Sequence, residues 1–328
     1  MLPGRSRIRG RQHCGNALRW GASLTKITAA DGTVTAYSLA SFATYGVIPA
    51  NWKDDESITG LTIGQGITSI GNAAFEDCED LGGNVVIPSS VTAIGASAFE
   101  GCEGLDGTLT LNEGLLTIED DAFIECGFTG SLTIPNSVTL VDEEAFEECE
   151  NFNGTLTLGT GLLTIGDSAF EDLDAMTGDL VIPDNVTTIG ESAFRSNNSM
   201  TGTLTIGSGL TRIDESVFKY GKWTNTNLVI PTNVTYIGEE AFEDCRWITG
   251  KLVLHAGITL LGEDAFEETF LLTSCDCYIA KTLTDEDIFA LSGITEIHVP
   301  ETGAVADTWS AGIQDVSGKS MDVIKDLT

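Results

Sequence analysis

The sequence predicts an elongated solenoid built from short, β-rich coils that stack on one another. Three observations lead to this fold class: a phenylalanine recurs at a fixed spacing, a pair of alternating apolar residues recurs with it, and glycine or proline recurs between the two. A fixed period of this size is typical of solenoids, because no single unit can bury its apolar side without a neighbour. We therefore expect one elongated domain, where a length of 328 residues alone would suggest two globular ones.

The phenylalanine is the clearest mark of the repeat. Successive copies lie 24 residues apart, with one step of 23. The copies are Phe75, Phe99, Phe123, Phe146, Phe170, Phe194, Phe218, Phe242 and Phe266. Alanine usually precedes the phenylalanine, and serine or acidic residues precede the alanine. This pattern predicts a short helical turn whose Ala-Phe edge points inward.

Each coil begins with a short strand. Val85 and Ile87 alternate with Val86, so that two side chains point inward and one points outward. A corner follows, formed by Pro88 here and by a proline in every second coil. Three positions after the strand, glycine, asparagine or serine recurs, which indicates left-handed backbone. Because the proline alternates, the full unit is a pair of coils, about 48 residues long.

The repeat Leu-x-Ile-Pro-x-x-Val-Thr-x-Ile-Gly-x-x-Ala-Phe-x-x-Cys-x-x-Leu-x-Gly resembles the BspA-like class of leucine-rich repeats, over roughly residues 58 to 301. The expected fold is a β-rich leucine-rich-repeat solenoid of about nine coils of 23–24 residues. It has a parallel sheet on one side, short helical turns on another, and irregular terminal caps. Many members of this class are cell-surface proteins that bind other proteins or mediate adhesion. The resemblance therefore implies a binding scaffold at the cell surface or outside the cell.

Four segments are expected along the chain. Residues 1–21 form an arginine-rich tail, disordered or a targeting segment, and residues 22–57 form an N-terminal cap in which Asp31-Gly32 marks a hairpin turn. Residues 58–274 are the regular coils, and residues 275–328 are a degenerate repeat, marked by Phe289, and a C-terminal cap. The tail lacks the hydrophobic segment of a secretory signal peptide. An apolar run of about 18 residues, which a membrane-spanning helix needs, is missing too, so no membrane insertion is expected.

The charge of the chain is strongly negative, at −33, with 16 Lys and Arg against 49 Asp and Glu. Such a chain repels nucleic acid and anionic membranes, so neither is an expected partner. Many acids flank the Ala-Phe motif directly, as in Asp120-Asp121 before it and Glu147-Glu148 after it. We therefore expect an acidic ridge along the Ala-Phe side of the solenoid.

Cysteine lies three residues after the phenylalanine in five coils, at Cys78, Cys102, Cys126, Cys149 and Cys245. Neighbouring coils bring such residues within disulfide reach, so buried thiols, one or two disulfides and a metal site are all open. Other coils have Leu, Asn, Gly or Thr at this position, which favours a packing role for buried free thiols.

No motif in the sequence indicates catalysis. The calcium loop Asp-x-Asp-x-Asp-Gly, the phosphate-binding loop and the Gly-x-Ser-x-Gly nucleophile elbow are all missing from the sequence. Paired glutamates recur in nearly every coil, which is typical of a solvated ridge and not of a unique acid-base pair. The sequence thus predicts no enzyme activity, no catalytic or metal-binding residues, and no cofactor.

The outward residue of each first strand defines a column without charge, which we call the neutral column. Its predicted partner-binding residues are Thr110, Thr133, Thr157, Val181, Thr205 and Val229. One interpretation is β-propensity alone, since Thr and Val suit strands whatever they contact. The other is a surface kept free of charge for a protein partner, because interface cores are poor in charge. On the second interpretation the protein is a monomeric protein-binding or adhesion scaffold.

Two other functions remain open. A structural spacer needs no binding surface at all. A glycan-binding solenoid needs a stripe of exposed aromatic residues, and Tyr220, Trp223, Tyr236 and Trp247 cluster in two consecutive coils as the alternative site.

Overall fold

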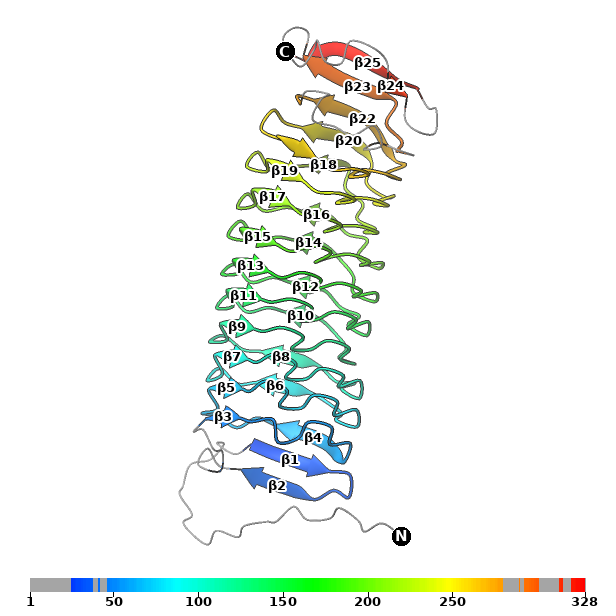
Figure 1. Cartoon of the computed structure of the whole chain (residues 1–328). Coiled ribbons are helices and arrows are strands. Elements are labelled where there is room, and N and C mark those ends of the chain that lie inside the picture. The colour runs from blue at the N-terminus through cyan, green and yellow to red at the C-terminus, as the bar shows by residue number, and fades with distance from the viewer. Residues whose placement is uncertain are drawn as a thin grey trace.

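The computed structural model is an elongated solenoid whose coils stack along one axis, from an N-terminal hairpin to a group of C-terminal strands (Figure 1). It describes residues 25–37, 41, 46–279, 289, 292–300, 313–314 and 320–327. The arginine-rich tail predicted for residues 1–21 lies outside the described residues. Each regular coil has three sides: a first strand, a second strand, and a side without strands that contains the phenylalanine.

The first side is formed by the strands that open each coil. These strands are β4 (Ile58–Thr62), β6 (Val85–Ile87), β8 (Leu109–Leu111), β10 (Leu132–Thr133), β12 (Leu156–Thr157), β14 (Leu180–Val181), β16 (Leu204–Thr205), β18 (Asn227–Val229), β20 (Gly250–Leu254), β22 (Leu272–Cys277) and β23 (Glu296–Pro300). Strand β23 pairs parallel with β25 (Ser320–Leu327), which pairs antiparallel with β24 (Ile313–Gln314). Along the regular coils the pairing is parallel and in register.

The second side also consists of strands, which form parallel sheets in addition to the predicted one. These strands are β3 (Val47–Ile48), β5 (Ser69–Ile70), β7 (Ala93–Ile94), β9 (Thr117–Ile118), β11 (Leu140–Val141), β13 (Thr164–Ile165), β15 (Thr188–Ile189), β17 (Arg212–Ile213), β19 (Tyr236–Ile237) and β21 (Leu260–Leu261). In the described chain, β3 to β15 form one seven-stranded parallel sheet, and β17, β19 and β21 form a separate sheet.

The two-coil unit predicted from the alternating proline is visible on the first side. Among the described strands the sheets there contain β6 with β8, β10 with β12, and β14 with β16. In each pair the strand of the proline coil donates to the next coil, as Leu180 N–H does to Thr203 O at 2.9 Å. The inward side chains follow the same alternation, since Val85 is 1% exposed and Leu109, in the second coil of the pair, 6%. The ladder therefore opens slightly after every second coil.

The third side contains stacked turns, and the predicted short helical turns are wrong. No described residue there belongs to a helix. Ser97, Phe99 and Gly101 donate their N–H groups to the next coil at 2.8–3.0 Å, while Cys102 N–H closes a four-residue turn onto Phe99 O. An α-helix would direct these donors four residues back within one coil. The backbone N–H groups that a helix would use within one coil thus form hydrogen bonds between stacked coils instead.

Left-handed residues occur two positions before and two positions after each phenylalanine. Around Phe194 they are Ser192, with φ of 56°, and Ser196, with φ of 58°. The sequence instead predicts left-handed residues at the corner after the first strand. Among the described corners, only Gly66 and Gly114 have positive φ at that position. Glycine at Gly161 has another cause: a Cβ atom would lie 2.0 Å from Asn136 O of the preceding coil.

The phenylalanines form a continuous ladder through the core. All nine are fully buried, and neighbouring rings stack with centroids 5.1–6.0 Å apart. Trp52 extends the ladder at one end, 5.4 Å from Phe75, and Phe289 extends it at the other, 6.2 Å from Phe266. At the N-terminal end β1 (Thr25–Ala29) and β2 (Val34–Tyr37) form the predicted hairpin, and β1 pairs antiparallel with β4. This hairpin covers a strand edge that would otherwise be open.

The left-handed turns lead to a test of stability. Replacing Ser192 by glycine should keep or raise the thermal midpoint, and Ser192→Val should lower it, because left-handed φ costs an L-residue about 1–2 kcal/mol and a β-branched one more. Thr188 in β15 is the matched control, since strand geometry reverses the order and favours valine over glycine. Thermal unfolding of the four variants, followed by circular dichroism, checks this, and equal thermal midpoints of the two Ser192 variants would contradict the turn geometry.

Candidate functional site

The structure exposes every predicted residue of the neutral column from Thr110 to Val229. The valines are the most informative members, because exposed apolar side chains need a reason: Val181 is 53% exposed and Val229 69%. Their inward neighbours, such as Leu180 and Leu228, are buried in the core. The period-two alternation read from the sequence therefore assigned these side chains to the correct face.

A second file of residues runs beside the neutral column, two positions before each column residue. Ser131 and Thr155 are exposed here, and Thr155 N–H donates to Ser131 Oγ at 3.1 Å. Asp179 lies in the same file and accepts from the backbone N–H of Thr203 at 2.6 Å, which holds the pKa of its carboxyl below the ordinary value. Asp179 thus brings a charge to the edge of the column, which sequence reasoning missed.

The second side is a further neutral surface that sequence reasoning also missed. Its seven-stranded sheet presents Leu116, 47% exposed, and Leu163, 45% exposed, beside Thr139 and Thr187. Thr139 and Thr187 each hydrogen-bond through the side chain to a leucine carbonyl of the preceding coil. The signal available in the sequence was the recurring Thr or Leu beside the inward Ile94 and its equivalents, but two-residue strands are too short for a reliable alternation pattern.

A hollow lies in the neutral column between β16 and β18. These two strands are not neighbours in any sheet of the described chain. Backbone hydrogen bonds between these strands are replaced by the side chain of Asn225. It accepts from Leu204 N–H at 2.8 Å and donates to Leu204 O at 2.7 Å. The resulting groove of about 320 Å³ is lined by Leu204, Thr205, Ile206, Asn225, Val229 and Pro231.

The third side has the acids, as the ridge hypothesis expects. The pKa of Glu147 is raised to about 7, first because its carboxyl is partly buried and then because Glu144 and Glu171 lie close. Burial raises the pKa of Asp121 to about 6, with Asp120 as the next cause. The acids of successive coils therefore repel one another along this side.

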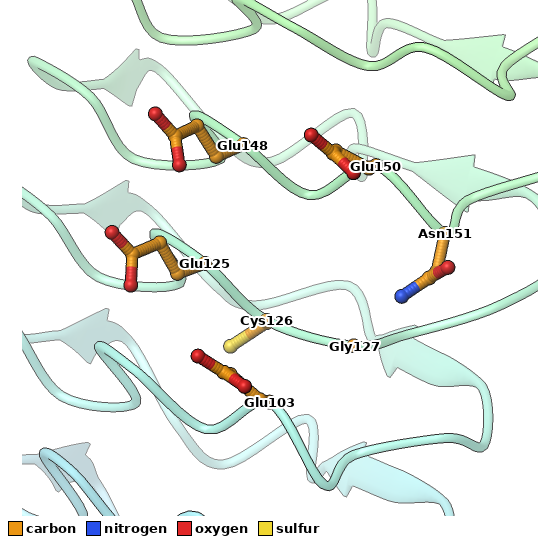
Figure 2. A pocket seen from close by; sticks show the side chains of 7 residues that line it. All are labelled: Glu103, Glu125, Cys126, Gly127, Glu148, Glu150 and Asn151. Carbon is orange, nitrogen blue, oxygen red and sulfur yellow. The ribbon is translucent and has the colours of Figure 1, made fainter.

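A hollow of about 410 Å³ lies within the ridge. Figure 2 shows Glu103, Glu125, Glu148 and Glu150 around it, contributed by three successive coils. Burial raises the pKa of Glu125, and Glu148 and Glu103 raise it further. No group of three or more His, Cys, Asp or Glu side chains in the described part of the chain has the geometry to hold a metal ion.

The cysteine column consists of buried free thiols. In the described chain Cys78, Cys102, Cys126, Cys149, Cys245, Cys275 and Cys277 are all buried and unbridged. Cys102 Sγ donates to Phe75 O of the preceding coil at 3.1 Å, and the other coils of the column repeat this bond. Burial raises the pKa of the Cys149 thiol to about 12, so the thiolate is disfavoured. These cysteines therefore act as packing residues and hydrogen-bond donors between coils.

The four aromatic residues of the alternative site do not form a stripe. Trp223 is fully buried and packs edge-on against Phe218 with centroids 5.7 Å apart, so it is unavailable to a ligand in this structure. Tyr236 lies on β19 of the second side, under the guanidinium of Arg212. Only Tyr220 and Trp247 come together, at a hollow of about 400 Å³ on the third side.

Short parallel strands on two sides, stacked turns on the third, and one phenylalanine per coil define a leucine-rich-repeat scaffold. The sequence matches the model of the family described as "BspA type Leucine rich repeat region (6 copies)" over residues 48–126, 68–201, 116–246 and 211–308. These matches span most of the chain, which therefore belongs to the BspA-type leucine-rich repeat family. Such repeat scaffolds are of the protein-interaction or adhesion type.

Solved structures of bacterial leucine-rich repeat proteins are similar to this chain. A leucine-rich repeat protein of Bacteroides ovatus is 19% identical over 74% of this chain and 86% of its own, with a TM-score of 0.44. The pneumococcal vaccine antigen PcpA is 16% identical over 80% and 78%, with a TM-score of 0.48. A leucine-rich cell surface protein of Faecalibacterium prausnitzii is 22% identical over 95% of both chains, with a TM-score of 0.38. None of the curated proteins matches the sequence.

A membrane-spanning helix is not found in the part of the chain that the structure describes, where no helix has the necessary length and hydropathy.

The acidic ridge predicts a pH-dependent stability. Because the folded-state pKa of Glu147 lies near 7 and the ordinary value is 4.5, the folded state binds more protons between these limits. The free energy of unfolding should therefore fall as pH rises from about 5 to about 8. Glu147→Gln should flatten this dependence and raise the thermal midpoint at pH 8, measured by circular dichroism.

Glu113 provides a control of opposite sign. Its pKa is lowered because it accepts from the backbone N–H groups of Asn136 and Ser137. Its carboxylate thus stabilises the fold above its unfolded pKa, and this contribution is lost as pH falls through its folded value. Glu113→Gln should lower the thermal midpoint at pH 8; a rise like that of Glu147→Gln would mean that net charge alone is responsible.

Proposed function

We propose that the protein is a non-enzymatic protein-binding or adhesion scaffold whose partner docks on the neutral column. One observation supports this most directly: from Thr110 to Val181 the exposed, uncharged column runs through coils in which every charged side chain is acidic. Between Lys53 and Arg195 the sequence contains no lysine or arginine. Interface cores are depleted of charge relative to the rest of a protein surface, so this column matches the expected chemistry.

The predicted contacts are Thr110, Thr133, Thr157, Val181, Thr205 and Val229. The exposed valines supply apolar area, and the threonines supply hydroxyl groups beside it. The groove between β16 and β18 adds concave surface at Thr205 and Val229, where a partner side chain can be enclosed. The acids of the third side do not face this docking surface and instead disfavour acidic competitors at long range.

A structural spacer is the second candidate function. The strands need Thr and Val for β-propensity in any case, so the composition of the column is compatible with a spacer. The groove beside Val229, a residue that is 69% exposed, favours a binding surface instead, because a spacer has no use for an apolar concave surface.

Arginine substitution tests the docking surface. The triple variant Thr133→Arg, Thr157→Arg and Val181→Arg places three charges on the neutral column without touching the core. If a partner docks there, its affinity should fall at least about a hundredfold, because each charge must be desolvated on binding. Partners are first captured from the native source, then titrated as purified proteins against wild type and variant by calorimetry.

The matched control changes net charge by the same amount on another side. Glu103→Gln, Glu148→Gln and Glu150→Gln remove three negative charges from the third side. This variant should bind the partner within a few-fold of wild type at physiological salt. Equal binding by the arginine variant, or an equal loss in both variants, would remove the neutral column from the docking surface.

A further inference from the structure

The edge that contains the acidic hollow changes character abruptly after Asp174. Two positions of the repeat line this edge, two and four residues after each phenylalanine. The position four residues after it has Glu79, Glu103, Gly127, Glu150, Asp174, Asn198, Lys222, Arg246 and Phe270 in successive coils. A solenoid that merely continued its repeat would keep the acids. The coils from Asn198 to Arg246 thus differ from the earlier ones, because an amide and then two cationic side chains replace the acids at this position.

The hollow of about 400 Å³ lies in these coils. Its lining residues are Ser196, Asn198, Tyr220, Lys222, Asp244, Arg246 and Trp247. Six of them occupy the two places in the repeat that hold the glutamates of the acidic hollow in Figure 2, and Trp247 occupies the place of Asn151. One corner of the coil thus builds two hollows of similar size, one with four glutamates and one with aromatic rings and balanced charge.

The aromatic residues of this hollow are placed where the fold does not need them. Tyr220 has φ of 63°, at a position where the other coils have Asp, Glu, Ser or Gly. A large side chain in left-handed backbone is strained, and such strain concentrates at functional sites. Trp247 is 52% exposed, so its indole ring is not a core residue either.

The coils around this hollow are also less regular than the others. The stacking distance from Phe194 to Phe218, at 6.0 Å, is the largest within the regular ladder. Among the described residues, three of the four buried side-chain polar atoms without a hydrogen-bond partner belong to Arg195, Asn197 and Trp223. Gly221 has no room for a Cβ atom, which would lie 1.8 Å from the Trp223 ring. Unsatisfied buried groups of this kind often accompany function.

The charges of the hollow balance one another. The guanidinium of Arg246 pairs with Asp244, with Nη2 to Oδ2 at 2.8 Å, and with Glu268, and it lies over the ring of Phe270. Lys222 adds one positive charge at the rim. The hollow therefore offers many hydrogen-bonding groups but no excess of one sign, which suits a neutral and hydroxyl-rich ligand.

We propose that this hollow binds an uncharged hexopyranose unit of a glycan, independently of the neutral column. Trp247 supplies the flat, electron-rich face onto which the C–H groups of a sugar ring pack. Arg195 and Lys219 lie over the Tyr220 ring, at 5.8 Å and 5.1 Å from its centre, and fix its position as a side wall. Asn198, Lys222 and the Asp244–Arg246 pair supply donors and acceptors for the hydroxyl groups. The volume is within the range of small-ligand sites.

The test uses the full chain and five simple probes. Methyl glycosides of glucose, galactose, mannose and N-acetylglucosamine, with methyl glucuronide as the charged comparator, are screened by saturation-transfer NMR and titrated by calorimetry. We expect saturable binding of at least one uncharged glycoside. Tyr220→Ser and Trp247→Ser should each weaken it about tenfold or more. Serine is the residue at the place of Tyr220 one coil earlier, Ser196, and at the place of Trp247 two coils earlier, Ser199, so the repeat already accommodates it.

Leu271→Ser is the matched control, since Leu271 occupies the place of Trp247 one coil later, is 44% exposed and does not line the hollow. It should leave glycoside affinity unchanged, as should the arginine variant of the neutral column. Absence of saturable binding by all four uncharged glycosides overturns the proposal, and so does binding restricted to the glucuronide. Unchanged affinity in the Tyr220→Ser, Trp247→Ser double variant overturns it too. If that variant instead loses a protein partner while no glycoside binds, the hollow belongs to a protein interface.

Discussion

The structure depends on one constraint, that equivalent residues of successive coils lie directly above one another. Two kinds of contact impose it together. The phenylalanine rings stack at 5.1–6.0 Å, and alternate N–H groups of the same segment donate to the carbonyls of the next coil. Ring stacking sets the spacing along the axis, while the hydrogen bonds fix rotation, because a coil turned by one residue loses its donors and acceptors at once. Linear spacing in the sequence is thereby converted into columns in space.

This constraint has a cost wherever the repeated residue is charged. An acid at one position of the repeat becomes a file of acids about one coil apart, and burial first and neighbouring acids second raise the pKa values of Asp121 and Glu147, so that a charge at these positions is unfavourable. At the corners the same stacking is favourable, since Glu113, Asp179 and Asp184 each accept backbone N–H groups from the next coil. Acids that accept hydrogen bonds from backbone N–H groups thus lie at the corners, and acids that mainly repel one another lie on the third side. Most of the charge that does not help stacking lies on the third side, which leaves the neutral column and the sheet from β3 to β15 without charged residues in their strands.

The sequence predicts the columns well and the local backbone poorly. The period places the phenylalanines, the inward strand residues and the cysteines correctly. A buried position recurs once per coil, and the apolar residue types at that position make it recognisable in the sequence. The strands of the second side are two residues long, too short to show an alternation. The helical turn at Ala-Phe was wrong because local propensity was the only information there, whereas the donors bond to a coil two dozen residues away. The left-handed backbone at Asp, Glu and Ser residues follows from those same hydrogen bonds, and the residue types at these positions do not indicate it.

Departures from the repeat carry information that the repeat itself cannot. A residue that recurs in nine coils is explained by stacking, so it says little about function. Trp223 is such a departure, and sequence reasoning placed it on the surface because its neighbours Tyr220 and Trp247 are aromatic too. In the structure its ring lies in the core beside Gly221, at the position where most other coils have cysteine, leucine or another side chain of the packing column. The sheet of the second side is interrupted nearby, between β15 and β17, and one of the recurring gaps of the first side, between β16 and β18, lies in the same coils. The two hollows that these coils form, at Val229 and at Trp247, open where stacking is least regular, because a perfectly periodic stack presents only flat faces and ridges to a ligand.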